Sequence, residues 1–284
     1  MFRYKVALVY FSFAMLSLSA NESASNVNYL NNLNSIKSNS DTASLSTDKK
    51  EAENIVDIAG RERMLSQRIA KDYIYIGNKV ALGSAKIELK SGLDEFGKNL
   101  NKIKVSVNDS EVKNMIDFVD MSFGDFKSAI KEPFNLDNAQ IVLDLSESLL
   151  EGSQYIVDGL TKNSSKTAKS AKDKLIAKSG KQRMLSQRIA KYYMAYQSGI
   201  KDKNTVMQMK NAVKEFDDNL KFLMANHTNT PEINSKLNEV KRLWKIVHNF
   251  YLGIEKGGLP FIVFKSTNDI TKEMDDITKL YDKL

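Results

Sequence analysis

Two identical segments carry the side chains with the clearest chemical potential in this chain. The run Arg-Met-Leu-Ser-Gln-Arg-Ile-Ala-Lys occupies residues 63–71 and returns unchanged at residues 183–191. A glycine lies three residues ahead of each copy, at Gly60 and Gly180. Arginine presents a planar fork of N–H donors that suits oxyanions, and glycine lets another group approach the backbone closely. The two segments, called the boxes below, therefore predict anion recognition or close helix contact.

The boxes are more alike than the repeat around them. At the same shift, residues 74–92 and 194–212 share only Lys90 and Lys210. A duplicated helix needs only its apolar pattern to survive, so unchanged boxes indicate a constraint on the boxes themselves.

Helical geometry gives the first box two faces. Its helix has an apolar stripe about 80° wide at about 100° per residue, formed by Ile55, Ile58, Leu65, Ile69, Tyr73, Ile76 and Val80. Gly60, Met64, Gln67 and Lys71 lie on the opposite face, with Arg63 on its flank. A small glycine, an adaptable methionine and an arginine with a planar fork of donors on one face favour contact with a second helix. The competing interpretation is a solvated face that has not yet diverged.

Composition bounds the architecture that must position the boxes. The chain has 284 residues, of which 42% are hydrophobic and 27% charged, and it has only three prolines. These values predict globular domains built from long helices, one for each repeat. Cysteine is absent, which excludes disulfides, thiolate metal sites and a cysteine nucleophile.

The N-terminus resembles a secretory signal. Arg3 and Lys5 precede an apolar run over residues 6–18, and small residues follow up to Ala20. The run is shorter than the ~20 residues that a stable membrane-spanning helix needs. We therefore expect residues 1–20 to be a signal peptide and the protein to be periplasmic in a Gram-negative bacterium, with an uncleaved anchor as the alternative. No later segment is apolar enough to predict a transmembrane helix in the mature chain.

Amphipathic periodicity predicts an all-α fold of two tandem antiparallel four-helix bundles. A disordered leader is predicted at 21–47, ahead of a first helix that begins near the capping box of Asp48 and Glu51. Further helix starts are predicted at Asn108-Asp109-Ser110 and Thr230-Pro231-Glu232. The bundles are expected at residues 48–160 and 171–284. The polar stretch 161–170 between them is compatible with a flexible linker or a continuous helix.

Catalytic and nucleic-acid functions find little support. His227 and His248 are not spaced as metal ligands, and neither recurs in the other repeat. Ser66 and Ser186 have no histidine in their repeat units to activate them. The basic residues are scattered among acidic ones, so we expect no nucleic acid as a partner. The sequence predicts a non-enzyme without a metal or other cofactor.

The pattern Gly60-x-x-Arg63-Met64-x-Ser66-x-Arg68 inside a helix resembles the box of PilJ/NarX-type sensor domains. Those are extracytoplasmic domains of type IV pilus chemotaxis transducers and of nitrate/nitrite sensor kinases. The resemblance implies two tandem four-helix bundles in which nitrate or nitrite is held between first helices. It implies a ligand-binding set of Gly60, Arg63, Arg68, Gly180, Arg183 and Arg188. Interface positions are expected at Met64, Gln67, Met184 and Gln187.

Receptors of this family continue into a second membrane helix and a signalling output, which the sequence does not show. We therefore expect an exported protein that binds a small oxyanion and acts through a separate membrane receptor, or as a homodimer. The alternative is a helical interaction protein without a ligand, associated with a receptor or a pilus system. In that case Arg63 pairs with a nearby carboxylate and braces the bundle.

Overall fold

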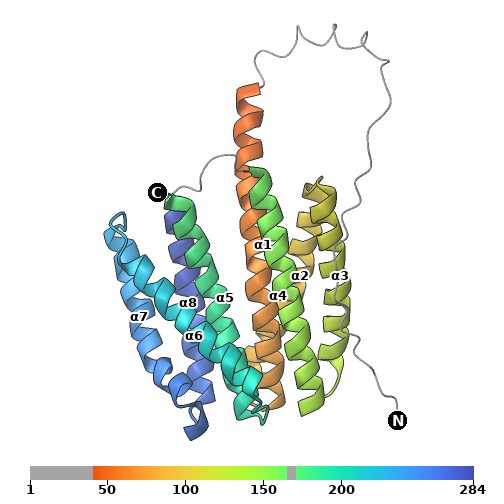
Figure 1. Ribbon diagram of the computed structural model, residues 1–284, viewed down its shortest axis with the longest axis vertical. Helices are drawn as coiled ribbons and strands as arrows, with labels where there is room; N and C mark the ends of the chain where they lie inside the picture. The colour runs from red at the N-terminus through yellow and green to blue at the C-terminus, as the bar shows by residue number, and fades with distance from the viewer. Residues whose placement is uncertain (1–40, 165–170) are drawn as a thin grey trace. The chain divides into compact units, whose positions relative to one another are not determined.

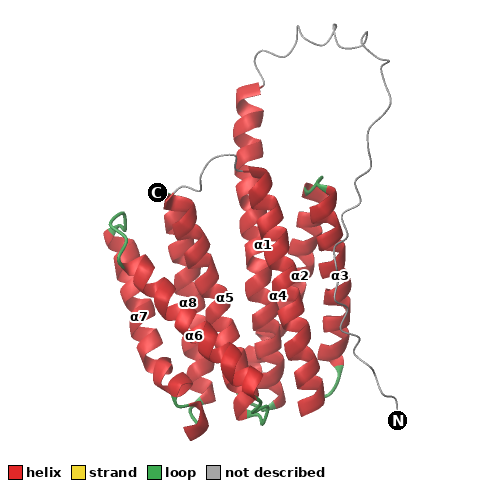
Figure 2. Cartoon of the chain, in the orientation of Figure 1, coloured by secondary structure: helices red, strands yellow, loops and turns green. Residues whose placement is uncertain are grey.

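The computed structural model describes residues 41–164 and 171–284, and the described residues form helices and no strand (Figures 1 and 2). The all-α prediction is confirmed. The helices are α1 (Asp41–Gly77), α2 (Leu82–Ser106), α3 (Ser110–Lys131), α4 (Leu136–Ser164), α5 (Ala171–Gln197), α6 (Lys203–Met224), α7 (Pro231–Leu252), the short 3-10 helix η1 (Ile254–Lys256) and α8 (Pro260–Asp282). The predicted signal peptide at residues 1–20 lies outside the described residues, as does the leader as far as residue 40.

Side-chain caps set several helix starts. Asp109 accepts hydrogen bonds from the backbone N–H groups of Glu111 and Val112, and α3 begins directly after it. Thr230 caps α7 ahead of Pro231, so both starts agree with the sequence.

The start of α1 is a correction. This helix begins at Asp41, ahead of the capping box predicted at Asp48. The intervening residues include neither glycine nor proline, so nothing in them ends a helix. The stretch predicted as linker or continuous helix at 161–170 starts as helix, because α4 runs to Ser164. Its remainder, residues 165–170, lies outside the described residues.

Residues Asp48–Leu284 form one compact unit. The rest of the chain, up to Thr47, is a separate unit, described only from residue 41 as the start of α1. Within the compact unit, α5 packs against α6 and α8, and α7 packs between the same two helices. These contacts close a four-helix bundle. In the other repeat, α3 packs against α2 and α4, and side chains of α1 contact both α2 and α4.

Equivalent aromatic pairs fill the two cores. Phe96 stacks on Phe123 with 4.4 Å between ring centroids. Phe216 stacks on Trp244 at 4.1 Å with nearly the same interplanar angle. Each pair joins the second helix of a repeat to the third, and offset stacking of this kind adds to the burial of apolar area. The repeated Glu-Phe-x-x-Asn-Leu pattern of α2 and α6 is thereby explained at its aromatic position.

Close helix packing predicts opposite effects for two glycines. A Cβ added at Gly152 on α4 would lie 2.5 Å from Val119 Cγ2 on α3, whereas a Cβ at Gly124 would meet nothing within 4 Å. We expect Gly152→Ala to lower the free energy of unfolding by about 1–3 kcal/mol through overpacking. Gly124→Ala should raise it by roughly 0.5–1 kcal/mol, because alanine has the higher helix propensity. Urea unfolding of the two variants tests this, and equal effects would contradict the packing described.

Candidate functional site at the two boxes

The boxes lie within α1 and α5, and both of their faces are buried. Leu65 and Ile69 enter the core as the apolar stripe predicts. On the opposite face, Met64, Gln67 and Lys71 are equally buried. A solvated face would leave these side chains exposed, so that interpretation is wrong. The face turned from the stripe meets other helices.

The last residue of each box reaches into the other repeat. Lys71 Nζ, from α1, donates to Asn268 Oδ1 on α8 at 2.8 Å. Lys191 Nζ, from α5, donates to Ser146 Oγ and to Glu147 Oε1 on α4 at 2.8 and 2.6 Å. Burying an ammonium group costs several kcal/mol unless it is paired and hydrogen-bonded. We call this contact zone between α1 and α8 and between α5 and α4 the seam.

The four predicted interface residues are all buried. Gln67 Nε2 donates to the backbone oxygen of Ser146 at 3.0 Å. Gln187 Nε2 donates to Thr271 Oγ1 at 2.7 Å and to Asn268 Oδ1 at 3.2 Å. Each glutamine thus holds the fourth helix of its own repeat. Met64 and Met184 complete the apolar part of the same face.

The Gly-x-x-Arg spacing has a direct structural reason in both boxes. Residues three apart on a helix lie one above the other, so the arginine can fold back over the glycine. A Cβ at Gly60 would lie 3.2 Å from Arg63 Nη2, and a Cβ at Gly180 would lie 3.3 Å from Arg183 Nη2. Arg63 Nε also donates to the Gly60 carbonyl at 3.4 Å. Glycine therefore makes room for the guanidinium on its own helix.

The two arginines differ in their partners. Arg183 pairs with Asp275 on α8 through Nη1 and with Asp57 on α1 through Nη2, the latter at 3.1 Å. Arg63 Nη1 instead donates to the neutral amide oxygen of Gln154 on α4 at 2.6 Å. Among the described residues, Arg63 forms no ion pair, and its Nη2 donates to none of them. The first arginine of the second box is charge-compensated, and the first arginine of the first box is not.

Electrostatics agree with this difference. Burial and, to a smaller extent, the positive charge of Arg183 lower the pKa of Arg63 to about 10, against the opposing influence of Asp158 and Asp57. Arg63 stays protonated at neutral pH, since that value is well above 7. Gln154 links Arg63 to the carboxylate of Asp158, because Gln154 Nε2 donates to Asp158 Oδ1 at 2.9 Å.

Sequence reasoning missed Arg61, which belongs to the same charge cluster. Arg61 pairs with Asp275 at 2.8 Å and with Glu95 at 3.3 Å. Lys181 pairs with Glu215 in the equivalent way. The recurrence of a basic residue and a glutamate at the same spacing in both repeats was the signal that could have found this contact. Asp57 and Asp275 offered no such signal.

Burial and hydrogen bonding act in opposite directions on Asp275. Burial alone would raise the pKa of its carboxyl, but Lys279, Arg183 and Arg61 together lower it. The carboxylate is therefore ionised at neutral pH and serves as the shared counter-charge of this part of the seam.

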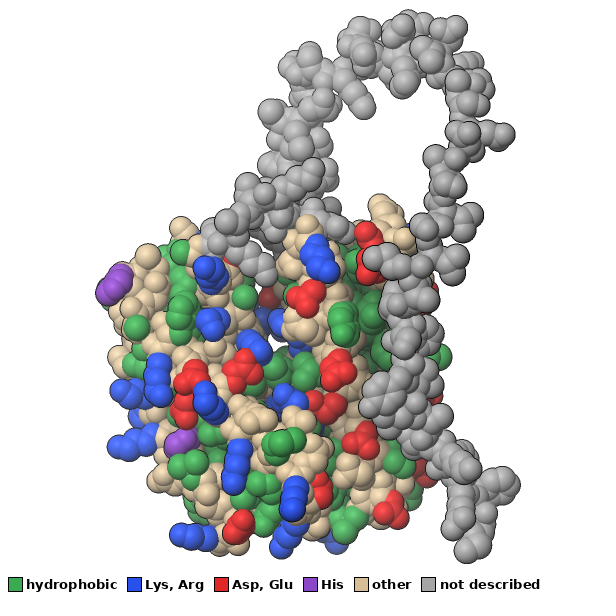
Figure 3. Space-filling model, viewed as in Figure 1, with side chains coloured by type: hydrophobic (Ala, Val, Ile, Leu, Met, Phe, Trp, Pro, Cys, Tyr) green, Lys and Arg blue, Asp and Glu red, His purple; other side chains and the backbone are tan. Residues whose placement is uncertain are grey.

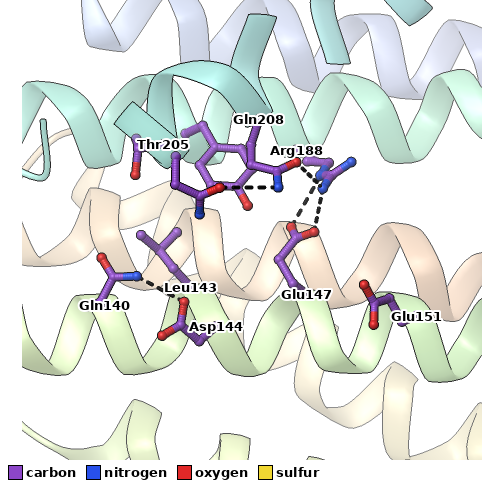
Figure 4. A pocket seen from close by; sticks show the side chains of 10 residues that line it. Gln140, Leu143, Asp144, Glu147, Glu151, Arg188, Thr205 and Gln208 are labelled. Carbon is purple, nitrogen blue, oxygen red and sulfur yellow. Dashed lines mark hydrogen bonds and ion pairs between the residues drawn. The ribbon is translucent and has the colours of Figure 1, made fainter. Parts of the chain in front are cut away.

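The predicted supporting arginines lie away from Arg63 and Arg183. Arg68 faces Glu88 on α2 at 3.9 Å. Arg188 donates to both carboxylate oxygens of Glu147 on α4, through Nε at 3.2 Å and Nη2 at 2.5 Å, and to Gln208 on α6 (Figure 4). The structure thus brings Arg63 and Arg183 near each other and assigns Arg68 and Arg188 to other contacts.

A pocket of about 380 Å³ lies beside Arg188, between α4, α5 and α6 (Figure 4). Its lining includes the carboxylates of Asp144, Glu147 and Glu151. Burial would raise the pKa of Glu147, but Lys191 and Arg188 bring it down to about 2. An acidic lining repels anions, so this pocket does not extend the arginine pair into one binding site.

A buried carboxyl directly ahead of the first box gives a further prediction. Burial raises the pKa of Glu62 well above its ordinary value; Glu95 adds to this and Asn99 opposes it. Glu62 Oε2 has no hydrogen-bond partner among the described residues, and Gln182 holds the equivalent position ahead of the second box. Glu62→Gln should raise the free energy of unfolding at pH 7 by about 1–3 kcal/mol.

The pH dependence of that gain follows from the sign of the shift. A carboxyl whose pKa is raised by folding destabilises the fold only above its unfolded pKa of about 4.3. The advantage of Glu62→Gln should therefore disappear near pH 4, as measured by urea unfolding at both pH values. An equal gain at pH 4 and pH 7 would contradict the burial of a proton-binding carboxyl.

A metal site finds no support in the described part of the chain. The residues there contain no cluster of three or more histidine or acidic side chains placed to hold a metal ion. His248 Nε2 lies 3.2 Å from Asp217, which also accepts from the Trp244 indole N–H. Acidic and basic side chains are interspersed on the face shown in Figure 3.

The comparison with known families finds one match. A model described as the N-terminal part of type IV pili methyl-accepting chemotaxis transducers, PilJ, matches residues 165–249. The matched range includes the second box and excludes the first. No curated protein and no solved structure matches the chain. Residues 165–249, with the second box among them, are therefore similar to the PilJ domain.

Proposed function

We propose that the protein is a helical sensory protein that binds a small oxyanion at Arg63. One observation carries the proposal: Arg63 is a partly buried guanidinium that has no ion pair among the described residues. It also lies close enough to Arg183 for the second charge to lower its pKa. A negative ion between the two arginines would remove this repulsion. The PilJ match supports a sensory role for the bundle.

The geometry favours one ion per chain rather than one per box. Arg183 already has two carboxylate partners in Asp275 and Asp57. An ion at Arg63 displaces no carboxylate, since the present partner is the amide of Gln154. Arg63 Nη2, held over Gly60, is the donor available to it. A planar oxyanion such as nitrate or nitrite fits the fork of a guanidinium.

The proposal extends to where and how the protein acts. The basic, apolar and small residues of the first 20 positions support export to the periplasm. No helix in the described residues is long and apolar enough to cross a membrane. We therefore propose that an anion-dependent change at the seam is read by a separate receptor. Mass spectrometry of the protein from the periplasmic fraction tests export, and an intact N-terminus on cytoplasmic protein would refute it.

Thermal melts test the binding proposal. A ligand that binds only the folded state stabilises it by about 2.7 kcal/mol at a hundredfold excess over its Kd. We expect nitrate, nitrite or another small oxyanion at millimolar concentration to raise Tm above that in chloride at equal ionic strength. If no small oxyanion raises Tm, the proposal fails.

The second box favours an alternative function. Its arginine is fully engaged in ion pairs that join α5 to α8 and to α1. A bundle in which both boxes only brace the seam would be an interaction protein without a ligand. Under that alternative, replacing Arg63 destabilises the fold, and no oxyanion changes Tm.

A further inference from the structure

The connections at the two ends of the bundle differ in character. At one end, the α2–α3 and α6–α7 connections consist mainly of asparagine, threonine and other polar residues. The α7–α8 connection, residues 253–259, lies at the other end (Figure 1). Exposed apolar side chains lie in it and directly beside it. Leu252, Leu259 and Phe261 are 64%, 58% and 57% exposed. We call these three side chains the apolar tip.

The equivalent connection in the first repeat turns its aromatic residue inward. Phe134 packs on Tyr73 with ring centroids 5.8 Å apart, and a Cβ at Gly77 would lie 2.0 Å from its ring. That connection has four residues, whereas the α7–α8 connection has seven and includes η1. In the longer connection Ile254 also turns inward, whereas Leu252, Leu259 and Phe261 at its two ends stay exposed.

The backbone beneath the tip is anchored. Gln197 Nε2 on α5 donates to the carbonyl of Ile254 at 2.9 Å, and Tyr75 Oη on α1 donates to the carbonyl of Pro260 at 3.1 Å. Gly258 lies against Tyr193, where a Cβ would be 1.9 Å from the hydroxyl. The side chains of the tip are therefore presented by a fixed backbone.

Exposed lysines lie at the same end of the bundle as the tip. The hydrogen bond of Asn78 to Ser198 joins the ends of α1 and α5, next to the α7–α8 connection. Exposed lysines at these chain ends are Lys79, Lys201, Lys203, Lys256 and Lys265. The acidic residues at the same end are Asp202 and Glu255, and also Glu132 and Asp137 beside Leu136, which lies against Gly199. Asp202 is engaged as the cap of α6. Exposed leucine and phenylalanine with lysines at the same end of the bundle match the interface of an anionic bilayer.

We propose that the apolar tip docks on an anionic lipid surface, with Leu252, Leu259 and Phe261 entering the interface and the lysines contacting headgroups. The lysines favour a lipid surface over an apolar groove on another protein. A protein groove would have to match the lysines one by one with its own acidic residues, whereas an anionic bilayer carries negative charge over its whole surface. This inference is independent of the proposed anion at Arg63.

Co-sedimentation with vesicles tests the proposal. The full chain should bind vesicles that contain phosphatidylglycerol and bind those of phosphatidylcholine alone much more weakly. Leu259→Ser combined with Phe261→Ser should weaken binding to the anionic vesicles at least tenfold. Lys256→Glu combined with Lys265→Glu should also weaken it, and more strongly at low salt.

A matched control removes exposed apolar side chains elsewhere. Val105 and Met121 are 84% and 64% exposed and lie outside the tip. Val105→Ser combined with Met121→Ser should leave binding unchanged. Any contribution of the apolar N-terminal run is the same in both double variants. The proposal is overturned if the full chain does not bind anionic vesicles, or if the two double variants bind equally. It is also overturned if the tip variant instead abolishes a dimer in sedimentation experiments.

Discussion

Replacing Arg63 with alanine should separate ligand binding from stability. We expect Arg63→Ala to weaken oxyanion binding roughly 10- to 150-fold, because a hydrogen bond between charged groups contributes about 1.5–3 kcal/mol. Without the anion, the variant should unfold at nearly the same denaturant concentration as the parent. Among the described residues the Arg63 side chain has only neutral hydrogen-bond partners, and its loss relieves repulsion from Arg183. Calorimetric titration and urea unfolding measure the two effects.

The second box supplies the control. Arg183→Ala removes the ion pairs with Asp275 and Asp57 and leaves Asp275 less compensated. It should therefore lower the free energy of unfolding clearly, although Arg61 and Lys279 remain beside Asp275. If Arg63→Ala destabilised the protein as much as Arg183→Ala, both boxes would be braces and the anion site would be refuted.

Neutralising Glu147 should give the largest loss of stability. Its carboxylate lies between two cations of the second box, 2.6 Å from Lys191 and 2.5 Å from Arg188. Glu147→Gln leaves both cations without their carboxylate partner, and breaking a buried pair costs about 3–5 kcal/mol. We expect Tm to fall by roughly 10 °C. Differential scanning calorimetry at pH 6 measures the effect.

The pH dependence of this loss has a definite sign. Burial lowers the pKa of Lys191 to about 8 even with Glu147 present. Near pH 9 the ammonium can lose its proton, so the variant should be less impaired than at pH 6. In the parent protein, the lowered pKa of Glu147 contributes stability above an unfolded pKa of about 4.3, which is lost as the pH falls through about 2.

Glu151→Gln is the matched control for this prediction. Glu151 lines the same pocket as Glu147 but is exposed. Its replacement should change the free energy of unfolding by no more than about 0.5 kcal/mol. Equal effects at the two positions would show that the carboxylate of Glu147 does not hold the seam together.

Local rules predicted the parts of the fold that depend on local sequence. Capping side chains located the starts of α3 and α7, because a cap and its helix lie within a few residues. Helical periodicity predicted the burial of Leu65 and Ile69. The early start of α1 was missed, since a capping signal inside a permissive sequence does not force a helix to begin there.

The partners of the box arginines could not be predicted, because they come from distant helices. Arg183 meets Asp275, and Arg63 meets Gln154, each about 90 residues away in sequence. Identical boxes gave no hint that one would face a carboxylate and the other an amide. That difference lies in α4 and α8, whose sequences diverged while the boxes did not. The position of Arg188 beside Glu147 depends on the seam in the same way.

Calorimetric titration of the protein with nitrate and nitrite tests the central claim most directly. The account predicts saturable binding of one ion per chain, abolished or strongly weakened in Arg63→Ala. Binding of two ions per chain would contradict the claim that Arg63 is available to an anion and Arg183 is not. The absence of binding heat for any small oxyanion, together with an unchanged Tm, would contradict the anion site and leave the boxes as a structural seam.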